Sequence, residues 1–173
     1  MRTTSLVVLA LLAAGVLSAA CTINRSHPLY KQCDPAWGND ALGSSSTICK
    51  VGCLMSSVSM ALASAGKTIN GQQSNPKTLN AFLKSNGGYS GNLFIWGSVG
   101  RFGVTYEGQP SDKTAIRNAI CANKVVILNV NNGGHWVLAT GFNGDTFNVN
   151  DPGYTRSTYG LNDFGVAGIY RFG

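Results

Sequence analysis

The sequence predicts an α+β fold, in which helices come first along the chain and antiparallel strands follow. Apolar residues recur at helical spacing in three segments between residues 53 and 121. From Val125 onward, branched and aromatic residues run together or alternate as they do in strands. Turn residues separate these later segments, which favours antiparallel hairpins. Helices and strands that are segregated in this way are typical of the α+β class.

The first helix is expected to begin at the pair Gly52-Cys53 and to end at Gly66. A thiol in the first turn of a helix lies beside unpaired backbone N–H groups and the positive end of the helix dipole, which favours the thiolate. Cys53 is therefore a candidate nucleophile, although most cysteines are structural, buried or disulfide-bonded. The apolar stripe of this helix consists of Leu54, Val58, Ala61, Leu62 and Ala65.

A second helix is expected from Asn75-Pro76, which supply an N-cap residue and a first-turn proline, to Gly87-Gly88, which end it. The stretch that follows, residues 89–103, is rich in glycine and aromatic residues. Such a stretch is consistent with the wall of a substrate cleft or with an irregular packed loop, and we favour the packed loop. The inner face of the second helix consists of Leu79, Phe82 and Leu83.

A third helix is expected after Ser111, its N-cap residue, with alanine and isoleucine along one face at positions 115, 116, 119 and 120. The period changes at Val125, where a run of branched residues predicts a buried strand. Asn131-Asn132-Gly133-Gly134 and Asn143-Gly144-Asp145 then provide two turns. The predicted strands are Val125–Val130, His135–Gly141, Thr146–Asp151 and Val166–Phe172.

The amino terminus has the three-part pattern of a secretory signal. A charged start precedes an apolar run from Leu6 to Leu17, and small residues follow at Ser18-Ala19-Ala20. We therefore expect residues 1–20 to be a signal peptide and residues 21–173 to form one exported domain, extracellular or periplasmic, without stable membrane insertion. A lipoprotein processed at Cys21 is the weaker alternative, because Ser18 stands where such sites usually carry leucine.

The charges of the chain favour no nucleic-acid partner. Thirteen lysine and arginine residues against seven acidic residues give a net charge of +6, and the charges are dispersed without a basic run. Cysteine and histidine spacings do not match a zinc site, and the glycine-rich stretches lack a phosphate-binding or dinucleotide fingerprint. A single glutamate, Glu107, makes paired-carboxylate chemistry on glycosides a poor hypothesis. We expect a monomer that needs no metal and no cofactor.

The cysteines that follow the predicted signal peptide are odd in number. In an oxidising compartment this leaves one thiol unpaired or intermolecular. If Cys53 is that thiol, the other four can form two disulfides. Four cysteines allow three pairings, of which we favour Cys33–Cys49 with Cys21–Cys121.

His135 is the best-placed base, because the other histidine, His27, lies just past the predicted signal peptide. His135 begins a strand after a Gly-Gly turn, and Asp151 ends the next strand of the same hairpin. Strands that pair around the intervening turn would place both side chains at one open end. A carboxylate that orients an imidazole, which takes a thiol proton, activates a cysteine nucleophile.

A thiolate that attacks an acyl carbon forms an oxyanion, which needs hydrogen-bond donors already aimed at it. The backbone N–H of Cys53 and the side-chain amide of Gln32 are the candidate donors. Each of these residues also has a plainer interpretation when it is taken alone. Cys53 would then be a structural cysteine, His135 a structural or surface histidine, and Gln32 a surface glutamine.

Four blocks of sequence, in order, are Tyr30-Lys31-Gln32, residues 52–62, residues 134–141 and residues 149–153. From Tyr30 to about Tyr159, they resemble the motifs of the peptidase C39-like family of papain-type cysteine peptidases. The resemblance implies a papain-like fold, in which an N-terminal helix bearing the nucleophile packs on a C-terminal antiparallel sheet bearing the base. It also implies that Cys53 is the nucleophile, His135 the base, Asp151 the orienting carboxylate and Gln32 the oxyanion donor.

One departure from the family pattern is Leu54-Met55, which stand where members commonly carry small residues. The first hypothesis is a secreted cysteine hydrolase that cleaves peptide or amide bonds through an acyl-enzyme. A catalytically inactive binding or toxin module with the same fold is an alternative, motivated by Leu54-Met55 and the aromatic residues of 89–102. A peptidoglycan amidase or acyl transferase on the same triad is another, so the expected partner is a peptide, protein or peptidoglycan substrate.

Overall fold

A computed structural model describes residues 20–23 and 26–173 of the chain. The predicted signal peptide, apart from Ala20, lies outside the described residues. The elements in chain order are β1 (Ala20–Thr22), β2 (Ala41–Leu42), β3 (Ser46–Thr47), α1 (Ile48–Val51), α2 (Cys53–Ser64), β4 (Thr68–Ile69), β5 (Gln72–Gln73), α3 (Pro76–Ser85), β6 (Tyr89–Ser90), β7 (Leu93–Phe94), the 3-10 helix η1 (Trp96–Phe102), β8 (Val104–Gly108), α4 (Lys113–Cys121), β9 (Val125–Val130), β10 (His135–Asn143), β11 (Thr146–Asn150), β12 (Thr158–Gly160) and β13 (Phe164–Phe172).

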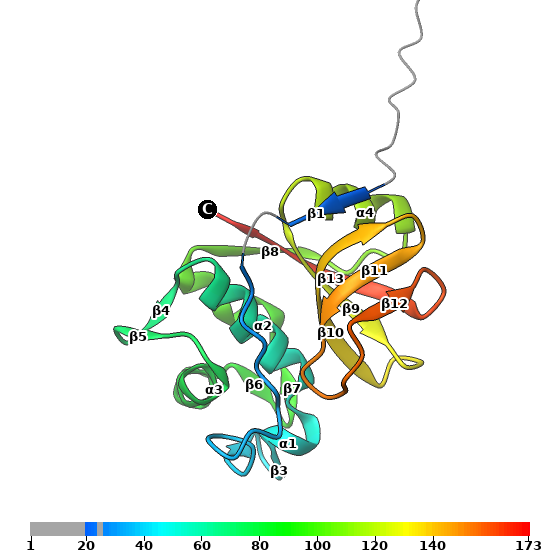
Figure 1. The fold of residues 1–173 in the computed structure, drawn as a ribbon. Helices are drawn as coiled ribbons and strands as arrows, with labels where there is room; N and C mark the ends of the chain where they lie inside the picture. Colours follow the sequence, from blue (N-terminus) through cyan, green and yellow to red (C-terminus); the bar gives the residue numbers. More distant parts are fainter. Residues whose placement is uncertain (1–19, 24–25) are drawn as a thin grey trace, which may run out of the picture.

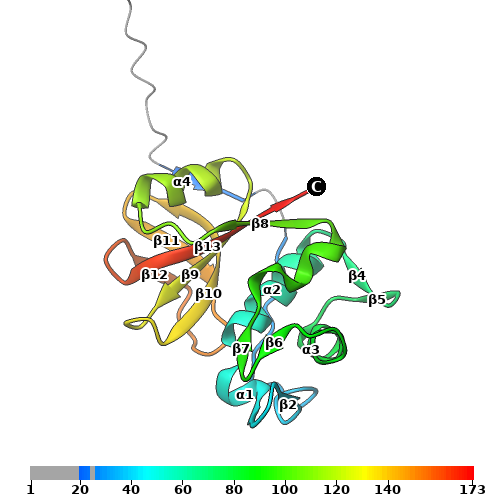
Figure 2. The same ribbon diagram turned by 180° about the vertical axis from the view of Figure 1, so that it is seen from behind.

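A seven-stranded sheet dominates the molecule. Its strands follow the order β12-β11-β10-β9-β13-β8, with β1 added to β10, and every pairing is antiparallel. Helices α1, α2 and α3 gather on one side of the sheet, and α4 lies on the other side (Figures 1 and 2). The predicted α+β class is therefore confirmed, and the arrangement is compatible with the papain-like fold that the resemblance implies.

Strand β9 carries apolar residues on both faces because both faces are covered. Val125 and Ile127 join the core beneath α2 and α3. Val126 and Leu128, which alternate with them, join a second core beneath α4. Successive side chains of a strand point to opposite faces, so a continuous run of branched residues is what a strand between two helical layers requires.

Helix α2 is the central element of the helical side. Residues 55–62 are all buried, and the helix packs against β10, β9 and α3. Gly52 precedes it, and a β-carbon there would lie 2.4 Å from the Ile48 carbonyl oxygen, so the close turn from α1 into α2 leaves no room for a side chain. Among the described residues, no helix is both long and apolar enough to cross a membrane.

The helices expected from the sequence are present, with one corrected boundary. Asn75 forms a reciprocal capping box with Thr78 at the start of α3. Helix α4 is capped by Asp112, whose carboxylate accepts the Thr114 N–H at 2.9 Å, so the prediction of Ser111 as the N-cap residue was wrong. An aspartate one residue closer to the first turn reaches the free N–H groups more directly.

The four predicted strands are confirmed, but β1, β8 and β12 were not predicted. All three lie at or near sheet edges, where tertiary pairing rather than local pattern defines them. Residues 89–103 form a short hairpin of β6 and β7 followed by η1. This segment is packed against the core, as favoured, and part of it also lines the cavity described below.

Both favoured disulfides are present. Cys21 pairs with Cys121 and joins β1 to the end of α4, whereas Cys33 pairs with Cys49 at the start of the helical side. Cys53 is free. The disulfide occupies the Cys21 thiol, which a lipoprotein would need for its lipid, so the lipoprotein alternative does not fit this pairing.

Candidate active site

A cavity of about 530 Å³ lies where the first turn of α2 meets the start of β10. Cys53 contributes from α2, His135 from β10 and Gln32 from the segment that precedes β2. Asp151 does not line the cavity and joins the site through its hydrogen bond to His135. The four residues singled out from the sequence are therefore brought together from four separate parts of the chain.

His135 and Asp151 form a buried pair. Asp151 Oδ1 accepts a hydrogen bond from His135 Nε2 at 2.7 Å, and the two residues are only 5% and 1% exposed. Strands β10 and β11 pair as far as Leu138 and Asn150, so Asp151 continues directly beyond the ladder toward His135. This is the placement expected from the hairpin pattern.

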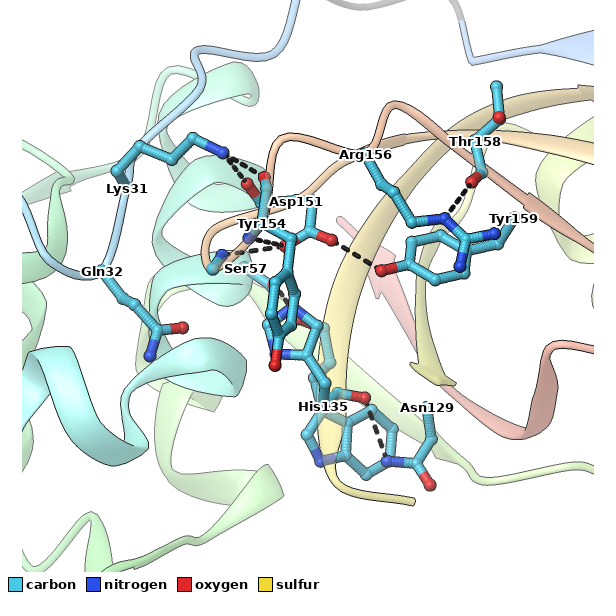
Figure 3. A network of polar contacts seen from close by, with 12 residues as sticks. Lys31, Gln32, Ser57, Asn129, His135, Asp151, Tyr154, Arg156, Thr158 and Tyr159 are labelled. Carbon is cyan, nitrogen blue, oxygen red and sulfur yellow. Dashed lines mark hydrogen bonds and ion pairs between the residues drawn. The ribbon is translucent and has the colours of Figure 1, made fainter. Parts of the chain in front are cut away.

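Asp151 is held by three donors besides His135. Its Oδ1 accepts the backbone N–H groups of Gly153 at 2.8 Å and Tyr154 at 2.9 Å, and its Oδ2 accepts the Tyr159 hydroxyl at 2.8 Å (Figure 3). Burial opposes ionisation of Asp151, but the hydrogen bonds from His135 and the other donors outweigh it and lower the pKa of the carboxyl. Asp151 is thereby fixed as a carboxylate.

The pKa of His135 is raised to about 9. Burial of the ring lowers the pKa, but hydrogen bonds to Asp151 and Cys53, together with the charges of these two groups, raise it by more. Because Nε2 is bonded to Asp151, Nδ1 is the ring nitrogen left for another partner. His135 lines one cavity with the free thiol of Cys53, and its charged form is favoured at neutral pH.

Gln32 is 8% exposed and is fixed by both its backbone and its side chain. Its N–H donates to the Pro152 carbonyl at 2.9 Å, and its Nε2 donates to the Cys49 carbonyl at 2.6 Å. Its Oε1 is buried without a hydrogen-bond partner in the described part of the chain. The Gln32 amide group is thus buried beside α1, which leads into Cys53. One Nε2 proton bonds to the Cys49 carbonyl, and the second is free to donate elsewhere.

The segment around Lys31 connects Gln32 to the Asp151 loop. Lys31 Nζ donates to the backbone carbonyls of Asp151 at 2.7 Å and Tyr154 at 2.5 Å (Figure 3). The Tyr154 ring meets the imidazole of His135 edge-on, with ring centroids 4.9 Å apart. Lys31, Tyr154 and Tyr159 were not identified as site residues from the sequence. Lys31 lies 120 residues from Asp151, and no local pattern singled out either tyrosine.

Gly153 lies close to the side chains of His135 and Gln32. A β-carbon at this position would lie 2.8 Å from His135 Cε1 and 3.3 Å from Gln32 Oε1. Its backbone has no positive φ, so what requires glycine here is close approach rather than an unusual conformation. The Pro152-Gly153 turn could be predicted from the sequence, but its contact with the imidazole could not.

The large side chains of Leu54 and Met55 pack mainly into the core. Met55 is 1% exposed within the cluster beneath α2, and Leu54 packs against the same cluster. Both residues contribute to the cavity wall, and the cavity retains its volume beside them. Within residues 20–23 and 26–173, no group of three or more histidine, cysteine or acidic side chains is arranged to hold a metal ion.

One of three comparisons with known proteins found a match. The model of the Peptidase C39 like family matches residues 26–167, which include all four blocks of motif and most of the described chain. Searches of curated proteins and of solved structures found no match at the threshold applied. A match over this length shows the family: the chain belongs to the Peptidase C39 like family.

Proposed function

We propose that the protein is an exported cysteine hydrolase that cleaves a peptide or amide bond, with Cys53 as nucleophile, His135 as acid and base, and Asp151 as orienting carboxylate. The observation that carries the proposal is that His135, hydrogen-bonded to Asp151 at 2.7 Å, lines the same cavity as the free thiol of Cys53. A free thiol in one cavity with an imidazole that a carboxylate orients supports a base-activated cysteine nucleophile.

The reaction follows from these roles. The Cys53 thiolate attacks the carbonyl carbon of the substrate, and the carbonyl π electrons move to oxygen. His135 then gives its proton to the leaving amine as the C–N bond breaks, which leaves a thioester on Cys53. Water attacks the thioester while His135 accepts its proton, and the collapse of the second tetrahedral intermediate releases the acid and restores the thiolate.

The oxyanion needs donors on the Cys53 side of the cavity. The backbone N–H of Cys53 is one candidate, because the first N–H groups of a helix have no intrahelical partner. The second Nε2 proton of Gln32 is the other, since the first is used by the Cys49 carbonyl. That bond and the bond from Gln32 N–H to Pro152 support a donor whose position is fixed before the substrate arrives.

Export is part of the proposal. Two disulfides are typical of proteins that fold in an oxidising compartment, and the amino-terminal pattern of residues 1–20 predicts a signal peptide. The free state of Cys53 supports a hydrolase over an inactive module, because an inactive module has no need to keep the odd cysteine reduced beside a histidine.

Labelling of the mature protein with an iodoacetamide probe tests the nucleophile. We expect the probe to label Cys53 in the native protein and to leave Cys53→Ala unlabelled, since the other described cysteines are disulfide-bonded. Cleavage of casein, but not of bacterial walls in a turbidity assay, would mark a peptidase, and the reverse an amidase. Equal labelling of both proteins, or full hydrolysis by Cys53→Ala, would contradict the proposal.

A further inference from the structure

The cavity has an apolar side as well as the polar side that holds Gln32, Cys53 and His135. This apolar side is formed by large side chains that reach the cavity from α2, β2, β6, β7 and β10. A preformed apolar recess with a few polar groups at one end is the usual form of a ligand-binding site. The apolar side consists of Leu42, Met55, Tyr89, Phe94 and Trp136.

The apolar side is held rigidly by contacts outside the cavity. The Tyr89 hydroxyl donates to Asn80 Oδ1 at 2.9 Å, and the buried Asn80 amide donates to the Ala41 carbonyl at 3.0 Å. The Tyr89 and Phe94 rings meet edge-on with centroids 6.5 Å apart. These contacts join β6, α3 and β2, so the recess exists without a ligand and costs little ordering when one binds.

The rim of the cavity is also apolar. Val51, Leu93 and Tyr154 are 41%, 75% and 55% exposed, and all three line the cavity. Single exposed apolar residues need no explanation, but three that line one cavity together with a free thiol make part of its opening apolar. An extended chain that carries apolar side chains would cover this rim.

Lys50 adds a cationic side chain to the cavity wall. No other lysine, arginine or acidic residue lines the cavity in the part of the chain that the structure describes. Lys50 is exposed, and its Nζ makes no hydrogen bond or ion pair with the described residues. By contrast, Lys31, Lys113 and Lys124 each donate to a carbonyl or a carboxylate. A free ammonium group at an apolar cavity favours a substrate with a carboxylate.

We propose that this cavity binds a polypeptide segment that carries a large apolar side chain and, close to it in sequence, a carboxylate that faces Lys50. This inference names the substrate class of the proposed function. That the bound segment is also cleaved rests on the proposed function. The stem peptides of peptidoglycan carry carboxylates but mainly small or polar side chains, so they would leave the apolar side empty. The apolar side thus favours a protein or peptide substrate.

Binding to the Cys53→Ala protein tests the substrate class without any reaction. Four dye-labelled peptides of equal length would combine leucine or alanine with glutamate or lysine at neighbouring positions, and fluorescence anisotropy would give their affinities. Replacing leucine by alanine should weaken binding about tenfold, because a buried leucine side chain is lost. Replacing glutamate by lysine should weaken it by about threefold to fivefold, as expected for one partly solvated ion pair.

A charge reversal at Lys50 tests whether this residue selects the carboxylate. When Lys50→Glu is added to the Cys53→Ala protein, the binding preference should change from the glutamate peptide to the lysine peptide. Lys77→Glu, on the exposed side of α3 and away from the cavity, makes the same change in net charge and should leave the preference unchanged. An equal shift in both variants would mean a general electrostatic effect and would overturn the role of Lys50.

The remaining outcomes separate this inference from the proposed function. Equal affinity for the leucine and alanine peptides, or tighter binding of a soluble peptidoglycan fragment than of the leucine–glutamate peptide, would overturn the proposed substrate class. If the binding preferences appear as expected but the native protein cleaves none of the peptides, the hydrolase proposal fails while the binding inference stands. If the native protein cleaves the peptides but the binding preferences are absent, the hydrolase proposal stands and the binding inference fails.

Discussion

His135 is the residue at which the geometry and the electrostatics of the site meet. Its ring is fixed by Asp151 at 2.7 Å, contacted edge-on by Tyr154 and closely approached by Gly153, so it has little freedom to turn. Its pKa of about 9 results from competition, in which burial favours the neutral ring and the interactions with Asp151 and Cys53 favour the charged ring. A change at Asp151 should therefore alter both the orientation and the charge of His135.

Asp151→Asn should lower the pKa of His135 from about 9 toward its ordinary value, because the burial remains while the main negative charge is lost. In the native protein, His135 loses its proton only as the pH rises through about 9, so the basic limb of kcat/KM for peptide hydrolysis should lie there, where the acid that protonates the leaving amine is lost. In the variant this limb should move to lower pH. Peptide hydrolysis should fall by about a hundredfold or more, the typical contribution of an acid–base group.

Asp163→Asn is the control for this substitution. It makes the same chemical change at an exposed carboxylate that pairs with Arg156 and lies outside the cavity. Both the pH profile and the rate should match those of the native protein. An unchanged profile in Asp151→Asn would refute the role of Asp151 as the partner that keeps His135 charged.

Lys31 is expected to be a positioning residue. Lys31→Met keeps much of the side-chain length but removes the donor to the carbonyls of Asp151 and Tyr154. The Asp151 loop should become less ordered, which should lower kcat for peptide hydrolysis with little change in KM. Lys31→Arg, which restores a donor, should recover part of the rate. A change in KM alone would instead indicate that Lys31 contacts the substrate.

At the scale of elements, the site depends on how the turn after β11 packs on the segment before β2. Three hydrogen bonds join the two segments, from Lys31 Nζ to two carbonyls and from Gln32 N–H to the Pro152 carbonyl. The turn that fixes His135 and the residue proposed as oxyanion donor are therefore parts of one hydrogen-bonded unit. Displacing the turn should disturb both.

Gly153→Ala tests this packing. The added β-carbon would lie within 2.8 Å of the His135 ring and 3.3 Å of the Gln32 amide, so one of them must shift. We expect a loss of hydrolysis of about tenfold or more, since small misplacements of reacting groups are costly. The fold should persist because the turn is on the surface. Gly165→Ala, where a β-carbon has no neighbour within 4 Å, should retain activity, and equal losses in both would contradict the argument.

At the scale of the whole molecule, the two disulfides have different tasks. Cys21–Cys121 closes a loop of 100 residues and attaches β1 to α4, and neither of these elements lines the cavity. Cys33–Cys49 closes a loop of only 16 residues, and both of its cysteines line the cavity. Cys21–Cys121 is therefore expected to affect global stability, whereas Cys33–Cys49 is expected to affect the geometry of the site as well.

Replacing Cys21 and Cys121 by serine should lower the free energy of unfolding by about 4.7 kcal/mol, the loop-entropy estimate for a loop of this length. Urea unfolding without reductant would measure the change, and hydrolysis at 25 °C should persist as long as the protein stays folded. The double variant Cys33→Ser/Cys49→Ser should lose less stability but more activity, because the Cys49 carbonyl holds Gln32. The reverse order of effects would contradict this division.

Much of the protein was determined by local sequence alone. Apolar spacing predicted α2, α3 and α4, and branched runs with Asn-Gly turns predicted β9, β10, β11 and β13. The parity of the cysteines predicted a free thiol, and the hairpin pattern predicted that His135 and Asp151 would lie at one end of neighbouring strands. These features follow from periodicities and turns that act over a few residues.

Only the tertiary structure decided the features that join distant segments. The hydrogen bond from Lys31 to the Asp151 carbonyl spans 120 residues and depends on how the two sides of the molecule dock. The approach of Gly153 to His135 and the bond from the Tyr159 hydroxyl to Asp151 depend instead on how the turn after β11 folds back on the sheet. The edge strands β1, β8 and β12 are likewise defined by their partners. Such contacts leave no periodicity in a single sequence, so the supports of the site and the apolar side of its cavity became visible only in three dimensions.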